Sequence, residues 1–500
     1  MKKRNTFNKL WSLLLCMTML VTFVTGCGSS ETQEPDDGEA VVEEKTDESS
    51  EEKTDVKVEV ATSGYQINES LNLDEEVTLS IYGPGLFSSG AEGLEEITTG
   101  LFKSGYNELA ARWNELYPNC ALEIEDIPWD NYQSAIQTAA LSGGIDIMVH
   151  GHIDGLAENL KPYLDADPEF TEQLFTHTTV KPATTNNDDE TPIQGLAMVL
   201  GPLVVWVDTE IFEHYGVELP EDDWTYYDLI EIAEQLTGTD PVTGEQTYGV
   251  QYYSPSGANL QFNYTQAALA CGAKAFELGE TIEDAKVNFA TKESVEAFEI
   301  IQAMAACACP DTIEGVDVSN VIDGNNNWAM MFSTEILNNS VLIEKNGLAD
   351  RYVVMNTPVC HAGEYEGVPT PWAGETTLAI YKDSEKKDWA WEFIKFILTD
   401  DVAVSWLASS NLMIPNNKDG VTAMASVLTE EQMEVCQYAL DTLPSTYNNS
   451  WNYVRNGRIA NINGTAMVTA VDNVVKGVMT PQEAADFLQQ SAEESMKSQQ

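Results

Sequence analysis

A His-Gly-His triplet is the first group of residues in this chain that could do chemistry. In DIMVHGHIDGLAENLKPYLD (residues 146–165), His150 and His152 follow an apolar run, and Asp154 lies close behind them. Histidine and carboxylate side chains bind zinc, which needs at least three protein ligands. The other histidines, at positions 177, 214 and 361, are distant in the sequence and have no metal-ligand spacing. We therefore expect no metal and no other cofactor, and we interpret His150 as the rim of a pocket for an organic ligand.

Alternating strands and helices place His150 at the end of a strand. VTLSIYG (77–83) is typical of a strand, SGYNELAARWNELYP (104–118) of a helix capped by Ser104, and CALEIEDIP (120–128) of a second strand. DNYQSAIQTAALSGG (130–144) then predicts a helix that leads into the strand IDIMV (145–149). This βαβαβ order predicts a parallel sheet, and in such sheets ligands bind beyond the carboxyl ends of the strands. Tyr82, Trp129 and His150 all lie at these ends.

The first 26 residues have the pattern of an export signal: a basic start, an apolar run to Val24, and then VTGC. The apolar run is too short to predict a membrane-spanning helix, which needs about 20 apolar residues. The four residues VTGC resemble a bacterial lipobox, which implies that the mature chain begins at Cys27 and carries lipid there. We therefore expect the protein to be anchored to the outer face of a membrane without crossing it. A plain signal with a coincidental cysteine is the alternative.

Residues 27–73 change sharply in composition, because they are rich in Glu, Asp, Ser and Thr and poor in large apolar side chains. This composition predicts a disordered acidic linker that holds the folded part away from the lipid. The whole chain has a net charge of −56, which argues against nucleic-acid binding. Six cysteines remain beyond Cys27, at positions 120, 271, 307, 309, 360 and 436. An exported chain permits disulfides, but we expect small buried thiols.

Several segments together carry a family resemblance. The stretch from IEDIPWDNYQSAIQTAALSGGIDIMV to GLAENLKPYLD resembles the first lobe of the extracellular solute-binding proteins of ABC importers, the sugar-binding family. PIQGLAMVLGPLVVWVDTEIFEHYGVELPEDDWTYYDLIEIAEQLT is similar to that family's crossing into its second lobe. GETTLAIYKDSEKKDWAWEFIKFILTDD, SSNLMIPNN and VMTPQEAADFLQQ resemble its return strand and helix, its second crossing and its last helix, which Thr480 to Glu483 begin as a capping box.

The resemblance implies a type II periplasmic-binding-protein fold, in which a hinge joins two α/β lobes around a ligand cleft. We expect lobe I to comprise residues 74–199 and 372–410, lobe II residues 200–371 and 411–490, and the C-terminal tail residues 491–500. The implied function is capture of a carbohydrate, expected to be an oligosaccharide, by a monomer that delivers it to an ABC permease. The chain departs from the family at Ile145-Asp146 and Val207-Asp208, where Pro-Asp and Tyr-Asn are usual. These departures bear on sugar specificity, since the crossing strand borders the cleft.

A sugar site needs flat aromatic rings for the C–H faces and amides or carboxylates for the hydroxyls. We expect ligand contacts from Trp129, His150, Trp372 and Trp451, and after them from Tyr82, Trp206 and Glu375. Core packing is the expected role of Trp113, Trp389 and Trp391. Two alternatives stay open: the same fold with a peptide, polyamine or metal as ligand, and a secreted carbohydrate hydrolase with paired carboxylates. No phosphate-binding loop motif occurs, so the importer's ATPase must be another chain.

Overall fold

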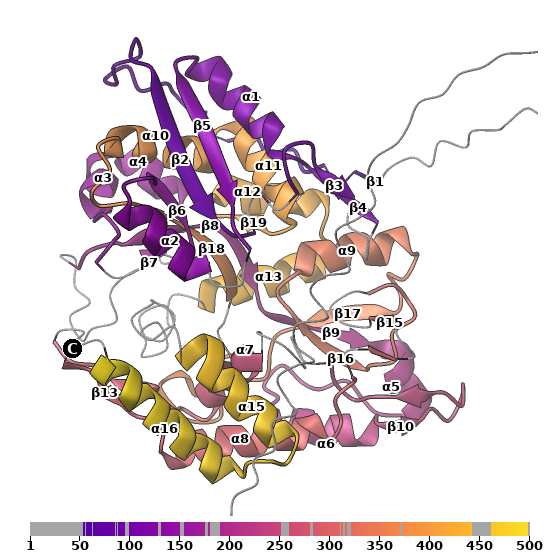
Figure 1. The fold of residues 1–500 in the computed structure, drawn as a ribbon. Helices are drawn as coiled ribbons and strands as arrows, with labels where there is room; N and C mark the ends of the chain where they lie inside the picture. Colours follow the sequence, from indigo (N-terminus) through magenta and orange to yellow (C-terminus); the bar gives the residue numbers. More distant parts are fainter. Residues whose placement is uncertain are drawn as a thin grey trace, which may run out of the picture. The chain divides into compact units, whose positions relative to one another are not determined.

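The predicted βαβαβ unit forms the first part of a seven-stranded sheet in the structure, a computed structural model. The structure describes residues 54–55, 57–62, 64–85, 87, 89–95, 100–128, 132–150, 155–175, 179–180, 191–251, 260–280, 284–310, 312–313, 316–317, 322–370, 373–442 and 462–498. Strand β2 (Val77–Gly83) pairs in parallel with β5 (Cys120–Asp126) and β6 (Ile147–Val149), and helices α1 (Tyr106–Leu116) and α2 (Tyr132–Leu141) connect them. The order of strands is therefore β5-β2-β6 at this end of the sheet, which confirms the prediction (Figure 1).

The remaining strands of this sheet pair in the antiparallel sense, beginning with the strand next to β6. Strand β18 (Ala373–Ile380) lies between β6 and β8 (Gly195–Pro202), and the short strands β7 (Thr179–Val180) and β19 (Ile414–Pro415) also pair with β8. Because β18 is antiparallel to β6, its first residues lie on the side where β2, β5 and β6 end. One edge of the sheet thus collects the carboxyl ends of the parallel strands and the start of β18.

Helix α10 (Lys387–Thr399) packs in the core beside this sheet and is buried on nearly every side. The sequence predicts one apolar stripe for it, and that stripe is buried together with Trp389 and Trp391. These two rings pack with Trp113 in one cluster of buried side chains, as we expected for all three. The helix also buries a carboxylate, Glu392, which accepts hydrogen bonds from the hydroxyls of Tyr65 and Tyr117. Helices α3 (Lys161–Ala166), α4 (Pro168–Gln173) and α11 (Asp401–Asn411) belong to the same region.

A second, three-stranded antiparallel sheet has the order β16-β9-β17, with β16 (Met330–Ser333), β9 (Val204–Asp208) and β17 (Tyr352–Met355). The chain enters it directly, because β8 ends at Pro202 and β9 begins at Val204. Its core continues into a group of helices: α5 (Thr209–Tyr215), α6 (Tyr226–Gln235), α7 (Leu260–Ala270), α8 (Lys292–Ala305), the π-helical turn η7 (Ile462–Met467), α15 (Val468–Val475) and α16 (Pro481–Ser498). Figure 1 shows α15, α16 and α8 side by side, in agreement with their contacts.

The remaining elements are short or lie at the junction of the two sheets. They are β1 (Thr54–Asp55), β3 (Leu94–Glu95), β4 (Leu101–Lys103), β10 (Gly238–Thr239), β11 (Gln246–Thr247), β12 (Phe276–Glu277), β13 (Lys286–Val287), β14 (Thr312–Ile313), β15 (Val316–Asp317), α9 (Ile336–Lys345), α12 (Lys418–Ala423), α13 (Glu430–Thr442), η4 (Gly363–Tyr365) and η5 (Met424–Ser426). Within the described ranges, no helix combines the length and apolarity that a membrane crossing needs. The six cysteines after Cys27 are buried free thiols, as expected.

Several of the described residues between 57 and 73, which the sequence assigns to the disordered linker, are packed on the fold. The backbone N–H of Val58 donates to Ser409 Oγ at 3.1 Å, and that of Val60 donates to Ser405 Oγ at 2.9 Å. Both valines are buried, and the alternating residues Lys57 and Glu59 are exposed. The average composition of residues 27–73 hid this alternating pattern, which is typical of an extended segment with one buried side.

Two smaller predictions concern helix ends. Ser104 does not cap α1, since the helix begins after Gly105 and no side chain caps it. The backbone carbonyls of Gly90 and Ala91 accept its first N–H groups at 3.0 Å each, so no side-chain cap is needed. The predicted tail from residue 491 is helical to Ser498 as the end of α16, and Ala492 is fully buried. The capping box at the start of α16 is confirmed by hydrogen bonds between Thr480 and Glu483.

Candidate functional site

Tyr82 and His150 come together at the carboxyl edge of the seven-stranded sheet. Tyr82 is the second-last residue of β2 and is aligned with Met148 of β6, two residues before His150. Both side chains are half-buried. Tyr82 packs with Tyr132 of α2 against a small apolar cluster that includes Met148 and Tyr381. The edge that the sequence predicts as a ligand site therefore carries aromatic side chains from both a strand and a helix.

His150 adopts a backbone conformation that residues other than glycine rarely adopt. Its φ is 57°, in the left-handed region, where a Cβ atom crowds the backbone. Its backbone N–H donates to the carbonyl oxygen of Thr377 at 2.8 Å, which holds the residue against β18. Its ring lies edge-to-face to Tyr132, with ring centroids 6.2 Å apart. Backbone strain of this kind is frequent at binding sites, and it fits the interpretation of His150 as a rim residue.

The other predicted contacts are placed only in part. The backbone of Glu375 pairs with Leu200 near the start of β18, so it belongs to the same sheet edge. Trp129, Trp372 and Trp451 lie outside the described residues, as does His152. Trp372 immediately precedes β18, whose first residue, Ala373, pairs with Pro202.

Trp206 is located differently from the expectation. It lies in β9, the central strand of the second sheet, where Met331 and Val354 are its neighbours in register. Its side chain is 0% exposed. Side chains pack on both faces of this central strand and cover the indole ring in this conformation, and its Nε1 has no hydrogen-bond partner among the described residues. The expectation placed the crossing strand on the cleft border, and the packing of both faces overrides it at Trp206.

Three buried glutamines, one after β11 and two on α7, escaped the sequence analysis. Gln251 is 0% exposed, and neither its Oε1 nor its Nε2 has a hydrogen-bond partner among the residues that the structure describes. Gln261 Oε1 and Gln266 Nε2 on α7 are likewise buried without partners. Buried amide groups are almost always hydrogen-bonded, so such a group marks a place where a ligand or water completes the bonding. The signal was present in LQFNYTQAALA, a helix with polar residues on several faces and no apolar stripe.

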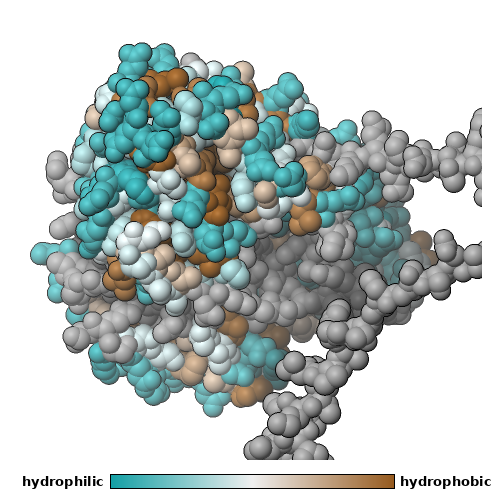
Figure 2. All heavy atoms as spheres, turned by 45° about the horizontal axis from the view of Figure 1, so that its top comes forward, coloured by the Kyte–Doolittle hydropathy of each residue, from teal (hydrophilic) through white to brown (hydrophobic). Residues whose placement is uncertain are grey.

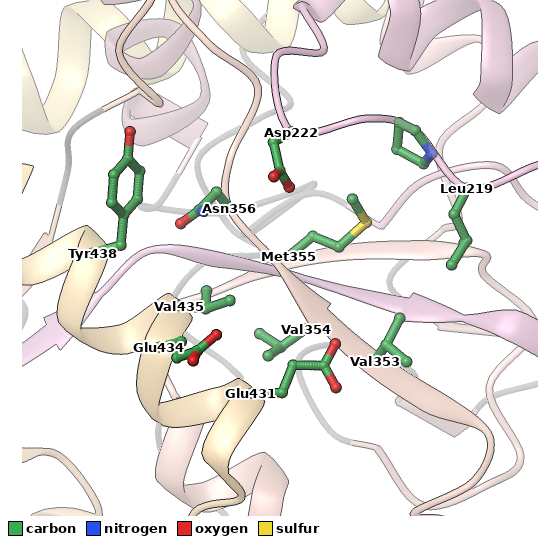
Figure 3. Close-up of a pocket in the computed structure, with 11 residues that line it drawn as sticks. Leu219, Asp222, Val353, Val354, Met355, Asn356, Glu431, Glu434, Val435 and Tyr438 are labelled. Atoms are coloured by element: carbon green, nitrogen blue, oxygen red, sulfur yellow. The ribbon is translucent and has the colours of Figure 1, made fainter.

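The structure also contains a cavity of about 500 Å³ beside β17. Figure 3 shows side chains from three segments around it: the residues of β17 and Asn356, the loop with Leu219 and Asp222, and the face of α13 that carries Glu431, Glu434 and Tyr438. None of the residues that the sequence predicts as ligand contacts lines it. Its volume would suit a small organic molecule, but its three carboxylates and one aromatic ring differ from the aromatic site expected for a sugar.

The exposed large apolar side chains of the described residues come from many segments of the chain. Figure 2 shows mostly hydrophilic residues on the face that it draws, with hydrophobic ones between them. Exposed large apolar side chains are scattered along the chain, for example Leu141, Val242 and Val478. Isolated side chains of this kind are normal on soluble domains and indicate no interaction surface.

Comparison with known proteins gives a family and a fold. Residues 99–404 match the family described as bacterial extracellular solute-binding protein. Similar solved structures include an ABC transporter solute-binding protein from Agrobacterium radiobacter in complex with ribitol, with a TM-score of 0.60 and 15% identity over 85% of this chain and 99% of that chain. An ABC substrate-binding protein from Listeria monocytogenes in complex with cycloalternan has a TM-score of 0.57 and 16% identity, over 85% and 99% of the two chains.

A third similar structure is the GacH receptor of Streptomyces glaucescens, solved without ligand and with acarbose. Its TM-score is 0.57 and its identity 16%, over 84% of this chain and 99% of that chain. Identities this low establish the fold and leave the ligand open. The comparison with curated proteins found no match.

Proposed function

Because this chain belongs to the family of bacterial extracellular solute-binding proteins, we propose that it captures a carbohydrate and delivers it to an ABC permease. The family consists of binding proteins rather than enzymes, so the hydrolase alternative is set aside. The single observation that carries the sugar proposal is the set of unpartnered buried amides, Gln251, Gln261 and Gln266. Three structural relatives carry ribitol, cycloalternan and acarbose, which supports the same class of ligand.

The proposed ligand is an uncharged polyol or oligosaccharide. Its hydroxyl groups would supply the donors and acceptors that the buried amides lack, and aromatic rings would cover its C–H faces. We propose Trp129, Trp372 and Trp451 as stacking rings, with His150, Tyr82 and Glu375 at the rim. Trp206 is left out of this set because its ring is fully buried in a cluster with Leu200, Trp328 and Met331.

Closure of two lobes about a hinge is the proposed mechanism. The proposed lobes, residues 74–199 with 372–410 and residues 200–371 with 411–490, are supported by two clusters of buried side chains. One cluster draws its members from residues 79–199 and 378–407, and the other from residues 203–365 and 466–492. A ligand that contacts both lobes stabilises the closed state by its difference in affinity for the two states. The direct passage from β8 to β9 at Leu203 is the proposed first hinge segment.

We propose attachment to the outer face of a membrane through lipid on Cys27. The linker in this proposal is shorter than the sequence predicted, because residues 57–62 and 64–73 belong to the fold. The protein acts as a monomer in this scheme. The permease and its ATPase are separate chains.

Calorimetry with a panel of monosaccharides, polyols and oligosaccharides tests the proposal. We expect saturable binding of at least one sugar. The Gln251→Leu variant should bind it at least about 10-fold more weakly, which corresponds to about 1.4 kcal/mol for lost hydrogen bonds. The control is Gln235→Leu, an exposed glutamine of α6, which should leave affinity unchanged. Binding of a peptide, a polyamine or a metal ion in place of any sugar would overturn the carbohydrate assignment.

A second measurement tests the proposed stacking. Trp372→Ala should weaken sugar binding by about 1 to 3 kcal/mol, the range for a central aromatic anchor. Trp206→Phe should instead lower the free energy of unfolding and leave affinity unchanged, because its ring is buried. An unchanged affinity in Trp372→Ala would remove that ring from the site.

A further inference from the structure

A cysteine, a glutamate and a histidine that are far apart in the sequence converge near the end of α7. Cys271 follows α7, Glu296 lies on α8, and His361 lies in the loop before η4. One ligand atom from each side chain lies within 4.8 Å of the other two. The Cys271 side chain is buried, and those of Glu296 and His361 are 34% and 17% exposed. The cluster therefore has a buried side and a side that solvent reaches.

The backbone holds these three residues in place by tight contacts. The N–H groups of His361 and Ala362 both donate to the carbonyl oxygen of Ala270, at 3.0 and 3.3 Å. Gly272 and Gly363 approach so closely that a Cβ atom on Gly272 would lie 2.7 Å from the Cα of Gly363. Both glycines have positive φ, and any larger residue would push the two segments apart. The fold thus brings Cys271 and His361 together without any need for a ligand.

The side chains of the cluster are connected but incompletely satisfied. His361 Nε2 lies 3.0 Å from Glu296 Oε1, and the hydroxyl of Tyr227 donates to the same oxygen. The rings of Tyr227 and His361 lie 5.1 Å apart. His361 Nδ1 is buried without a hydrogen-bond partner in the described part of the chain. One ring nitrogen and the thiol therefore remain available beside a carboxylate.

The charges around the cluster favour a cation. Glu296 and two further carboxylates of α8, Glu293 and Glu299, act electrostatically on the Cys271 side chain. Among the described residues, Glu296 forms an ion pair with His361. A negative field of this kind attracts a divalent cation.

A second histidine–carboxylate pair shows what a purely structural arrangement looks like in this fold. His214 Nδ1 lies 2.8 Å from Asp240 Oδ2. The other oxygen of Asp240 accepts the backbone N–H groups of Val242 and Thr243, at 2.7 and 2.8 Å. This pair is completed by backbone donors and belongs to no metal-binding group that the described residues form. The cluster at His361 differs because it adds a thiol and leaves a ring nitrogen without a partner.

We propose that Cys271, Glu296 and His361 bind a zinc ion, with water as the fourth ligand. Sulfur, imidazole nitrogen and carboxylate oxygen are the ligand types that zinc prefers, at about 2.0 to 2.3 Å from the metal. Tetrahedral geometry at those bond lengths separates ligand atoms by about 3.4 to 3.8 Å, so a small adjustment of side chains brings the cluster into range. Tyr227 would orient the carboxylate from outside the metal's own ligands.

The proposed zinc ion would join the end of α7, the middle of α8 and the loop that carries His361. These elements belong to the region of the second sheet, and none of the residues proposed to contact the sugar belongs to the cluster. Zinc binding is therefore expected to raise the stability of this region and to leave sugar affinity unchanged. Failure of either proposal would leave the other intact.

The test uses the full chain, stripped of metal with a chelator and kept reduced. Calorimetry with Zn²⁺ should show one ion per chain, and Zn²⁺ should raise the midpoint of thermal unfolding. Co²⁺ should produce the near-ultraviolet charge-transfer absorption of a thiolate–cobalt bond. The variants Cys271→Ser and His361→Gln should each weaken zinc binding at least about 10-fold. Matched controls are Cys436→Ser, another buried thiol, and His214→Gln, the other histidine paired with a carboxylate.

Four results would overturn the proposal. The first is the absence of stoichiometric zinc binding by the reduced chain, and the second is a cobalt complex without thiolate absorption. The third is zinc affinity that Cys271→Ser leaves unchanged. If this variant does not fold, the cobalt spectrum of the unmodified chain still decides, because it reports directly on a sulfur ligand. Cys360→Ser, which alters the neighbouring buried thiol, should retain binding, and loss of binding in this variant alone would also contradict the assignment.

Discussion

In both sheet regions an aspartate caps the N-terminus of a helix and also binds an arginine, but the surroundings of the arginine differ. In the first region Asp400 caps α11 through the backbone N–H groups of Val402 and Ala403, at 3.1 and 3.2 Å, and accepts two hydrogen bonds from Arg112. In the second region Asp208 caps α5 and binds Arg351 through Nε and Nη2, at 3.0 and 2.7 Å. Each aspartate thus joins a helix N-terminus to a distant arginine.

The difference lies in what surrounds the arginine. Arg112 makes its other side-chain bond to Glu115, whose side chain is 69% exposed. Arg351 also donates to the carbonyl oxygen of Gly324 at 3.2 Å and lies 5.3 Å from the ring centre of Tyr352. The second pair is therefore fixed to a loop and a strand as well as to a helix. Its loss should disturb more of the molecule.

This comparison also explains one departure from the family. The usual Tyr-Asn of the crossing strand is replaced by Val207-Asp208, and both residues are 0% exposed. Val207 packs in the second core, and Asp208 is engaged by Arg351 and by α5. The departure therefore serves the core and the helix start. It gives no argument about sugar specificity.

The largest expected effect comes from removing the charge of Asp208. Asp208→Asn keeps a good helix cap but removes the buried counter-charge of Arg351, whose side chain is 24% exposed and keeps an ion pair with the half-exposed Glu210. We expect a loss of about 2 to 4 kcal/mol in the free energy of unfolding, and about 1 to 3 kcal/mol for Asp400→Asn, where the more exposed Arg112 remains paired with Glu115. Denaturant unfolding of both variants measures this difference.

Double-mutant cycles sharpen the same comparison. Asp208→Asn with Arg351→Met should give a larger coupling energy than Asp400→Asn with Arg112→Met. Equal losses in the two aspartate variants would show that the added contacts of Arg351 contribute nothing measurable. In that case the two regions would be equivalent in this respect.

The two regions also differ in how much of their structure the sequence predicts. Strands β2, β5 and β6 agree with the expectation because their alternating or continuous apolar runs are local signals. The pairing of Asp208 with Arg351 joins residues 143 positions apart, and the cluster of Cys271, Glu296 and His361 joins three separate elements. Local patterns carry no information about such contacts. The same limitation put Trp206 among the expected ligand contacts, because a strand's sequence does not tell which neighbours cover it.

The candidate sugar site was predicted in part for the same reason. The ends of parallel strands are local features, so the edge position of Tyr82 and His150 followed from the sequence. The amides of Gln251, Gln261 and Gln266 were missed, since burial without a partner is a property of the packed structure. The composition of the predicted linker led to a different error, because it predicted disorder for a stretch that is packed. The acidic residues 27–53 concealed the short alternating stretch at Val58 and Val60.

The packed segment at Val58 and Val60 contacts α11 of the first sheet region, and we expect it to contribute to stability. Its Thr62 donates from its backbone N–H to Asp401, in the first turn of the helix that Asp400 caps. Val60→Ala should lower the free energy of unfolding by about 1 to 2 kcal/mol, from two methyl groups lost from a buried site. Glu59→Ala, at the exposed neighbouring position, should change it by less than about 0.5 kcal/mol. Equal and negligible effects would mean that this segment is detached in solution, as its composition suggests.

The smallest expected effect concerns the other end of α5 and depends on pH. Burial acts to raise the pKa of Asp240, but hydrogen bonds from the backbone N–H groups of Thr243 and Val242 and from His214 outweigh it and lower the pKa. A carboxyl group whose native pKa lies below its unfolded value, about 3.9, stabilises the fold fully above that value. This stabilisation is lost as the pH falls through the native pKa.

Asp240→Asn should therefore cost about 0.5 to 1.5 kcal/mol near pH 7, the range for a hydrogen bond of this kind. The difference in unfolding free energy between the unmodified chain and the variant should stay constant down to about pH 5 and shrink below about pH 4. Urea unfolding at a series of pH values measures it, with the exposed Asp350→Asn as control. A difference that grows toward acid pH would mean that burial dominates and that the pKa of Asp240 is raised. The C-terminal end of α5 would then be held by packing alone, in contrast to the charged pair at its N-terminus.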